Sequence, residues 1–267
     1  MGVSVTLLAS GSRGNCAVVA SSTTRILVDA GISCRETFKR IRAIGESPDQ
    51  ISAILITHEH SDHVAGLQRL ASKLNVPVFL TQPTCHSWTR AMRDEEGKVP
   101  ELPRIEHFSS GRSFQIGDIA VHPFTIPHDA ADPVGFTFRA EGVRIGYVTD
   151  LGYVPVSVRD HLRGCDVLVI ESNHDVEMLR GGPYPWSVKQ RVMSRVGHLS
   201  NDALAEFFTS DYDGEAAYVV LAHISEQNNH PEVARAAAEH ALRDRQGLWR
   251  NRIMLATQSE ALEPIRL

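Results

Sequence analysis

The chain has 267 residues, of which 42% are hydrophobic and 22% charged, and its formal net charge is −5. This length and composition allow a substantial core within one large α/β domain. No apolar run approaches the roughly 20 residues that span a bilayer, and the first residues lack a basic region followed by a cleavage site. We therefore expect neither a membrane partner nor a secretory signal. The acidic balance excludes a wholly basic surface, so any contact with a polyanion must come from a local patch.

The four cysteines are scattered along the chain and include no C-x-x-C pair: Cys16, Cys34, Cys85 and Cys165. A disulfide framework or a zinc ribbon would need a different spacing. We expect free, mostly buried thiols in a reducing compartment, which predicts a cytoplasmic protein.

The first half of the chain predicts strands that alternate with helices. A glycine-rich turn at residues 10–15 follows the first strand. Ser33 and Glu36 form a capping-box pattern that begins a helix ending at Gly45. A second helix follows His63, with apolar residues at helical spacing. The strand-like runs are residues 3–8, 17–20, 25–29, 53–57 and 77–81, and the run at 53–57 is continuously apolar, as in a sheet covered on both faces.

The second half contains more strands and closes on helices. Residues 93–104 read as a surface loop, and the segment 178–201 reads as an irregular loop that becomes helical near Ser187. Ser200 is a candidate cap for the next helix, and Pro231 is suited to the first turn of the last one. Strand candidates are residues 119–124, 135–139, 144–149, 167–171 and 217–222. The pattern predicts a layered α/β architecture.

A dense group of polar side chains directly follows the apolar run at 53–57. It consists of His58, His60, Asp62 and His63. In extended chain, His58 and His60 point to the same side, while Asp62 and His63 fall where the chain turns into a helix and can serve a second position nearby. Imidazole and carboxylate together suit zinc, and equally manganese or iron. A solvated polar loop is the alternative, but it does not explain three histidines and an aspartate within six residues.

This H-x-H-x-D-H motif after an apolar strand resembles the signature of the metallo-β-lactamase fold. The resemblance implies a four-layer αββα sandwich, formed as a single hydrolase domain over residues 1–267, with two divalent metal ions, zinc or manganese, at the edge of its sheets. It also implies later ligands at strand ends. His58, His60 and His128 would hold one metal, Asp62, His63 and His223 the other, and Asp150 would bridge them. Asp29 matches an early structural aspartate, which we expect to brace the loop.

Further strings extend the resemblance over essentially the whole chain. Residues 8–16, 171–175, 197–201 and 222–229 look like those of the YycJ/WalJ group of short exonuclease-like proteins. The group implies cleavage of nucleic-acid phosphodiesters, 5′-to-3′ on DNA rather than RNA. The predicted substrate-binding residues are Asn173, His174, Ser200 and Asn201. The chain lacks room for the inserted domain of the larger nucleases of the superfamily, so nothing is implied about substrate selection by an extra domain.

The segment 178–201 also favours a phosphate substrate. It contains Arg180, Lys189, Arg191 and Arg195 and no acidic residue. Trp186 and Tyr184 lie among these cations, and aromatic rings can stack on unpaired bases. A solvated amphipathic helix with a buried tryptophan explains the same pattern equally well.

The predicted mechanism is two-metal hydrolysis. A metal-bridging hydroxide would attack the phosphate in line, with the metals about 3.5 to 4 Å apart. Asp62 would orient this hydroxide as well as bind metal, and His198 would help the leaving group. Two alternatives stay open: a small-molecule hydrolase of the same fold (a cyclic phosphodiesterase, a thioesterase of the glyoxalase II kind or a lactonase), and a non-catalytic metal-binding module. The sequence does not predict an oligomeric state.

Overall fold

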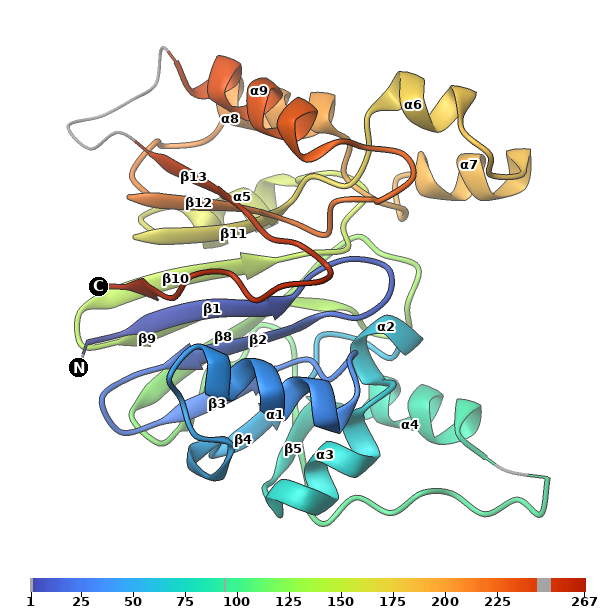
Figure 1. Cartoon of the computed structure of the whole chain (residues 1–267), viewed down its shortest axis with the longest axis vertical. Coiled ribbons are helices and arrows are strands. Elements are labelled where there is room, and N and C mark those ends of the chain that lie inside the picture. Colours follow the sequence, from blue (N-terminus) through green and yellow to red (C-terminus); the bar gives the residue numbers. More distant parts are fainter. Residues whose placement is uncertain (1, 94, 244–250) are drawn as a thin grey trace.

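The structure is a computed structural model that describes residues 2–93, 95–243 and 251–267. Two sheets of seven described strands each lie face to face, and helices cover the outer side of each sheet (Figure 1). The chain therefore has the predicted four-layer αββα sandwich. None of the described helices is long and apolar enough to span a bilayer.

The first sheet comes from the first part of the chain together with the last strand. In spatial order its strands are β14 (Ile265–Arg266), β1 (Ser4–Ala9), β2 (Cys16–Ala20), β3 (Arg25–Val28), β4 (Ala53–Leu55), β5 (Val78–Thr81) and β6 (Ile105–Phe108). The helical segments of this half are α1 (Cys34–Ala43), the 3-10 turn η1 (Pro48–Gln50), α2 (Ser61–Val64), α3 (Leu67–Leu74) and α4 (Gln82–Ala91). Strands β3 to β6 run parallel, so their carboxyl ends lie at one edge of the sheet.

The second sheet follows in the chain. In spatial order its strands are β13 (Arg252–Leu255), β12 (Tyr218–Ala222), β11 (Val167–Glu171), β10 (Val143–Val148), β9 (Val134–Ala140), β8 (Ile119–Thr125) and β7 (Phe114–Ile116). Its helices are α5 (Val156–Leu162), α6 (Val176–Gly181), α7 (Trp186–Val192), α8 (Asn201–Ser210) and α9 (Pro231–Leu242). Strands β10 to β13 run parallel and also end at a common edge.

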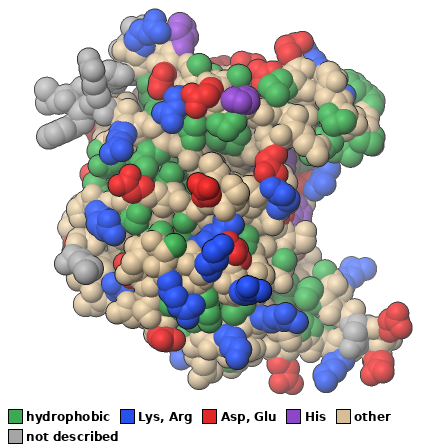
Figure 2. Space-filling view, in the orientation of Figure 1, with side chains coloured by type: hydrophobic (Ala, Val, Ile, Leu, Met, Phe, Trp, Pro, Cys, Tyr) green, Lys and Arg blue, Asp and Glu red, His purple; other side chains and the backbone are tan. Residues whose placement is uncertain are grey.

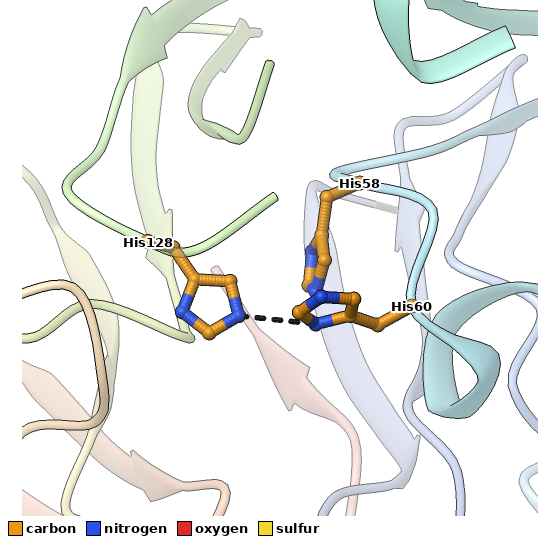
Figure 3. A group of neighbouring side chains, drawn as sticks. All are labelled: His58, His60 and His128. Carbon is orange, nitrogen blue, oxygen red and sulfur yellow. Dashed lines mark hydrogen bonds between the residues drawn. The ribbon is translucent and has the colours of Figure 1, made fainter. Parts of the chain in front are cut away.

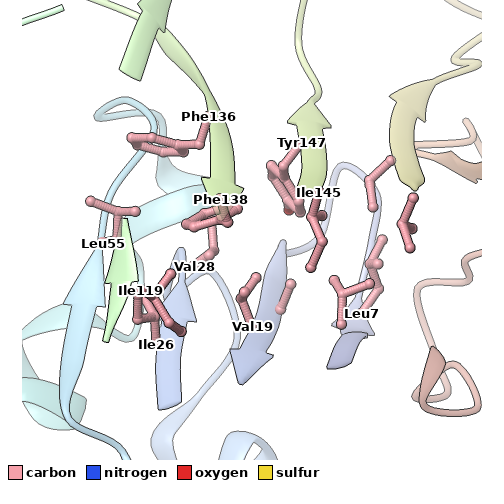
Figure 4. Close-up of a cluster of buried hydrophobic side chains, with 14 of the residues drawn as sticks. Leu7, Val19, Ile26, Val28, Leu55, Ile119, Phe136, Phe138, Ile145 and Tyr147 are labelled. Carbon is pink, nitrogen blue, oxygen red and sulfur yellow. The ribbon is translucent and has the colours of Figure 1, made fainter. Parts of the chain in front are cut away.

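The principal core lies between the two sheets. Alternate residues of both sheets meet there, because side chains of a strand point to opposite faces in turn. Figure 4 shows Val19 and Val28 of the first sheet facing Phe138 and Tyr147 of the second. Two further apolar clusters fill the spaces between each sheet and its helices. The continuous apolar strands are thus buried on both faces, as their sequence predicts.

Several predicted details are confirmed and others are wrong. Ser33 caps α1, since its side chain accepts a hydrogen bond from the amide of Glu36, and the four cysteines are free, as predicted. The predicted helix after His63 is broken at Gly66 into α2 and α3. The segment at residues 178–181 is the end of α6 rather than an irregular loop, because the Asp175 side chain caps the helix by accepting from the amide of Met178.

The sequence analysis missed some short elements. These are the helices α4 and α5 and the strands β6, β7, β13 and β14. Strands of two to four residues give too little alternation to recognise. In α4, Thr81 at the end of β5 serves directly as the N-cap, so no loop separates strand from helix.

Candidate metal centre

The predicted ligands meet where the parallel strands of both sheets end. Three residues that follow such strands have positive φ angles without being glycine: Asp29 directly after β3 (61°), Asp150 two residues after β10 (60°) and His223 directly after β12 (51°). This conformation is unfavourable for most side chains and is concentrated at functional sites. It turns each side chain out of the strand direction, toward the shared edge.

The first group of side chains is His58, His60 and His128. Their ring nitrogens lie within 4.8 Å of one another, and Figure 3 shows the three rings converging from two loops of the chain. The rings of His58 and His128 are nearly perpendicular, with centroids 4.9 Å apart. His128 Nε2 lies 3.2 Å from His60 Nδ1, and the Nδ1 of His128 lies 3.1 Å from the carbonyl oxygen of Gly197.

The second group is Asp62, His63, Asp150 and His223, whose ligand atoms also lie within 4.8 Å of one another. His63 Nε2 is 3.4 Å from Asp62 Oδ2 and 3.3 Å from Asp150 Oδ2. His223 Nε2 is 3.3 Å from Asp62 Oδ2 and 3.4 Å from Asp150 Oδ1. Two carboxylates and two imidazoles thus alternate around one point.

Asp29 lies behind this second group. Its carboxylate is 2.8 Å from His63 Nδ1 and accepts hydrogen bonds from the amide and the hydroxyl of Thr57. The carboxylate orients the ring of His63 so that Nε2 points into the group, as partners behind a metal-binding histidine do. Asp29 therefore contacts the strand end and one histidine rather than the point where the ligands converge, which is consistent with the expected bracing role.

Glu171 is a site residue to which the sequence analysis gave no role. This fully buried carboxylate, the last residue of β11, lies 2.8 Å from His198 Nδ1 and 3.2 Å from His223 Nδ1. Its other oxygen accepts from the amides of Leu151 and Leu199. Glu171 thereby fixes two histidine rings at once. The signal in the sequence that could have identified Glu171 is its position as the one charged residue of the otherwise apolar strand β11.

Asn15 is the second residue without a predicted role. Its amide nitrogen lies 3.1 Å from Asp62 Oδ2 and 3.0 Å from His63 Nε2. The glycine-rich turn that carries Asn15 packs closely on the α2 loop. A Cβ on Gly31, beside Asn15, would lie 1.7 Å from the carbonyl oxygen of Asp62, so only glycine fits there. The turn therefore holds the Asp62 loop in place.

In the part of the chain that the structure describes, the buried carboxylates of the cluster have only histidines as close side-chain partners that can carry positive charge. Among the described residues, no lysine or arginine forms an ion pair with Asp62, Asp150 or Glu171; their close partners are histidines. Although burial opposes it, the carboxylates Asp150 and Asp29 hold the pKa of His63 well above its usual value. Burial lowers the pKa of His58 well below its usual value, which leaves this imidazole neutral. His58 of the first group therefore offers a neutral imidazole, while the two carboxylates of the second group favour positive charge between them.

These residues fit divalent metal ions. The buried Nε2 of His58 and the buried Oδ2 of Asp150 form no hydrogen bond in the described structure, and leaving such atoms without a partner is costly. Neutral imidazole nitrogens and carboxylate oxygens are ligands that zinc and manganese accept. His58, His60 and His128 would hold one ion, and Asp62, His63 and His223 the other, with Asp150 in reach of the second group.

The four residues expected to bind substrate take part in protein contacts. The amide nitrogen of Asn173 donates to the carbonyl oxygen of His223 at 2.9 Å, and that of Asn201 donates to Asn229 at 2.9 Å. His174 is buried, and burial lowers its pKa to about 4. Ser200 caps α8 by accepting from the amide of Ala203. Three of them are buried and support the loop around His198 and His223; substrate contact by these residues stays a prediction.

The basic segment around α7 is less cationic than its sequence predicts. Arg180 pairs with Glu177 at 2.9 Å, and Arg191 pairs with Asp129, the neighbour of His128, at 2.5 Å. Lys189 is buried and donates to the carbonyl oxygen of Arg180. Trp186, in contrast, has 61% of its surface exposed, so it is not the buried tryptophan of an amphipathic helix. The segment is therefore a structured arm, anchored beside His128, that exposes an aromatic ring.

Replacing Glu171 with glutamine is expected to weaken metal binding about 10- to 100-fold, the scale of losing a partner behind a ligand. The amide would keep the shape of the side chain but remove the negative charge that holds the rings of His198 and His223. The affinity for zinc, measured by competition with a chelating dye, checks this. Glu206→Gln, an exposed change on α8, is the matched control and should leave the affinity unchanged.

The surface over the ligands is open. Figure 2 shows histidine side chains at the right-hand edge of the molecule, in an indentation between the surface over α7 and the surface over α4. Hydrophobic side chains gather at the upper right, over α6 and α7, where Met178, Trp186 and Val188 are exposed. Of the seven expected ligands, His60 and Asp62 are partly exposed and the other five are buried, so solvent reaches the cluster at these two residues.

Comparison with known proteins places this geometry in context. A family described as "Beta-lactamase superfamily domain" matches residues 24–224. The chain is 39% identical to the exodeoxyribonuclease YycJ of Bacillus anthracis, over 92% of this chain and 91% of that protein. It is 36% identical to the exodeoxyribonuclease WalJ of Streptococcus pneumoniae, over 88% and 86%. The metallo-beta-lactamase fold protein YhfI of Bacillus subtilis has a similar fold, with a TM-score of 0.71 at 13% identity over 98% of this chain and all of that one.

Proposed function

The chain belongs to the beta-lactamase superfamily of metal-dependent hydrolases, in its YycJ/WalJ-like group, and from this premise we propose that it is an exodeoxyribonuclease that uses two metal ions. The main support for this proposal is the presence of two ligand groups at one edge of the sandwich. One group consists of three histidines, and the other of two histidines and two aspartates. The names of the two similar relatives supply the class of substrate, which is DNA.

Each group of residues has a distinct part in the proposed reaction. Two divalent ions, when bound, supply Lewis-acid activation of water and of the scissile phosphate. Asp62, at the open side of the second group, accepts a hydrogen bond from the attacking water and orients it in line with the phosphorus atom. Asp150, which follows β10, lies beside His63 and His223 and keeps these two rings in position. The rigid strand ends supply the positioning on which phosphoryl transfer depends.

His198 is the proposed proton donor to the leaving oxygen. Its Nδ1 is held by Glu171, and its Nε2 forms no hydrogen bond within the described residues, so Nε2 is available to the substrate. Although burial opposes it, the Glu171 carboxylate raises the pKa of His198. A histidine with a raised pKa keeps a proton to donate near neutral pH.

The proposed direction of degradation is 5′ to 3′. An exonuclease needs a site that is open on one side to receive the remaining strand, and the indentation between α7 and α4 provides such an opening (Figure 2). The names of the relatives do not state a direction of cleavage, so the proposed direction rests on the resemblance of this chain to the YycJ/WalJ group.

The substrate class is tested by incubating the metal-loaded protein with 5′-phosphorylated single- and double-stranded DNA, with RNA, with a cyclic nucleotide, and with S-lactoylglutathione. We expect release of nucleotides from DNA ends. Turnover of the cyclic nucleotide or the thioester without cleavage of DNA would replace the proposal with a small-molecule hydrolase. Tight DNA binding without cleavage, with any divalent metal, would replace it with a binding module.

Trp186 is expected to stack on an unpaired base of the strand. Replacing Trp186 with alanine should raise the KM for single-stranded DNA about 5-fold or more with kcat unchanged, because stacking one base on an aromatic ring contributes ~1–3 kcal/mol. Steady-state kinetics on single-stranded oligonucleotides check this. Val233→Ala, an apolar exposed change on α9, should leave KM unchanged. An unchanged KM in the Trp186→Ala variant would show that Trp186 of α7 does not contact the DNA strand.

A further inference from the structure

A second hollow lies away from the ligand cluster, on the outer face of the second sheet. It has a volume of about 420 Å³ and lies over β8, β9 and β10, beside α5. Its polar lining consists of Ser113, His122, Thr137, Arg139, Arg144 and His161. His122, in the middle of β8, precedes His128 by six positions, about 20 Å along extended chain, so the hollow is separate from the ligand cluster.

Two arginines lie side by side in this hollow. Arg139 of β9 and Arg144 of β10 are directly opposite each other in the antiparallel register. Like charges at directly opposite positions destabilise a strand pair, and no carboxylate is among the lining residues. The rings of His122 and His161 lie 5.0 Å apart beside them. Four side chains that can carry positive charge therefore converge without an anionic partner in the hollow.

The carboxylates of the adjoining surface already have partners. Asp118 accepts a hydrogen bond from Ser21 at 2.6 Å, Glu141 accepts from the amide of Ser22 at 2.8 Å, and Asp166 accepts from the amide of Arg144 at 2.7 Å. All three carboxylates lie around an adjoining hollow together with Arg139 and Arg144, but none forms an ion pair with either guanidinium group within the described residues. Their negative charges therefore act on the arginines only from the adjoining hollow, and no carboxylate lies in the hollow with the two histidines.

The donors of the hollow are oriented and partly unused. One terminal nitrogen of Arg144 donates to the carbonyl oxygen of His161 at 2.8 Å, which fixes the guanidinium, while its buried Nε has no hydrogen-bond partner. Ser113 Oγ lies 2.8 Å from His122 Nδ1. Burial and then the charges of Arg144 and Arg139 lower the pKa of His122, which reports the positive field inside the hollow.

We propose that this hollow, which nothing in the proposed nuclease reaction uses, binds a phosphate group through Arg139 and Arg144. Planar guanidinium groups recognise phosphate through paired hydrogen bonds, and a dianion offsets the repulsion between two like charges. The Ser113 and Thr137 hydroxyls and the two imidazoles supply further donors. The phosphate comes from one of two sources: a free phosphate monoester, or the backbone of a DNA strand that runs over β8 and β9.

The test is phosphate binding by calorimetry at constant ionic strength, with chloride as the balancing anion. Inorganic phosphate is titrated into the metal-loaded wild-type protein, into Arg139→Gln, and into the double variant Arg139→Gln/Arg144→Gln. Arg139 is exposed, so its replacement leaves the fold intact, and Arg90→Gln on α4 is the matched control. A titration of the wild type in the presence of a 12-nucleotide DNA strand with hydrolysis-resistant phosphorothioate linkages separates the two sources.

We expect the dissociation constant for phosphate at this site to rise at least 10-fold in Arg139→Gln and further in the double variant, with no change in the control. Binding that is identical in the wild type and both variants would overturn the proposal, because the metal centre alone would then account for it. If DNA displaces phosphate from the wild type, the site takes backbone phosphate; if it does not, the site takes a phosphate monoester.

Discussion

Asp150→Asn is expected to lower kcat/KM on DNA by about 10³-fold or more, the scale at which preorganised electrostatic groups contribute to catalysis. Asp150 lies 3.3 Å from His63 Nε2 and 3.4 Å from His223 Nε2, and its buried Oδ2 has no hydrogen bond of its own. Asparagine has the same shape but lacks the charge that a cation requires. The loss should be accompanied by a fall in bound metal, measured by elemental analysis of the purified variant.

The matched control for this experiment is Asp49→Asn, which makes the same chemical change at an exposed position of η1. It should retain full activity and metal content. A variant at Asp150 that kept both would show that this carboxylate is not part of the metal centre. A circular dichroism spectrum unchanged from the wild type excludes misfolding as the cause of the loss.

His198→Gln is expected to lower kcat by about 10²- to 10⁴-fold, the usual range for removing a general acid, with metal content unchanged. The reason is that His198 is not one of the expected metal ligands: its Nδ1 is held by Glu171 at 2.8 Å and lies 3.7 Å from Asp150 Oδ1. Glutamine can still form a hydrogen bond but cannot transfer a proton in this pH range. Single-turnover kinetics on end-labelled DNA measure the chemical step.

The pH profile separates this role from a structural one. A general acid acts in its protonated form, so the wild-type rate should fall as pH rises through the pKa of His198. Since this pKa is raised, with burial opposing and Glu171 favouring the shift, the fall should occur above the usual range for histidine. His198→Gln should lack this fall. If the rate of the His198→Gln variant falls at alkaline pH in the same way as the wild-type rate, His198 is not the proton donor.

The sequence could predict which residues meet in the candidate metal centre, because its expected ligands follow recognisable strands. His58 to His63, Asp150 and His223 each come directly after a buried apolar run, and parallel strands end at a common edge. Residues that follow parallel strands can therefore be expected to lie close together in space even when they are far apart in the sequence. The same reasoning could have found Glu171, which ends β11, but the histidines that it holds become evident only when their rings are placed.

Other features depend on contacts between distant segments, which a pattern along the chain does not contain. The basic residues of the α7 arm appeared unpaired, yet Arg191 pairs with Asp129 from the loop of His128. Asn15 reaches Asp62 across 47 positions. Arg139 and Arg144 are ordinary strand residues in the sequence, and their opposition depends on the register of β9 and β10. Short strands such as β13 and β14 form because they pair with the neighbouring strands β12 and β1, and their own sequences are too short to show an alternating pattern.

We propose that the two ligand groups form a metal-dependent site that degrades DNA from an end. The most direct measurement is a time course on DNA labelled separately at its 5′ and 3′ ends, with added manganese or zinc and with a chelator as control. We predict immediate release of labelled mononucleotide from the 5′ end, progressive shortening of the 3′-labelled strand, and no cleavage with the chelator. Internal fragments from the first time point, or cleavage that persists without metal, would contradict the account.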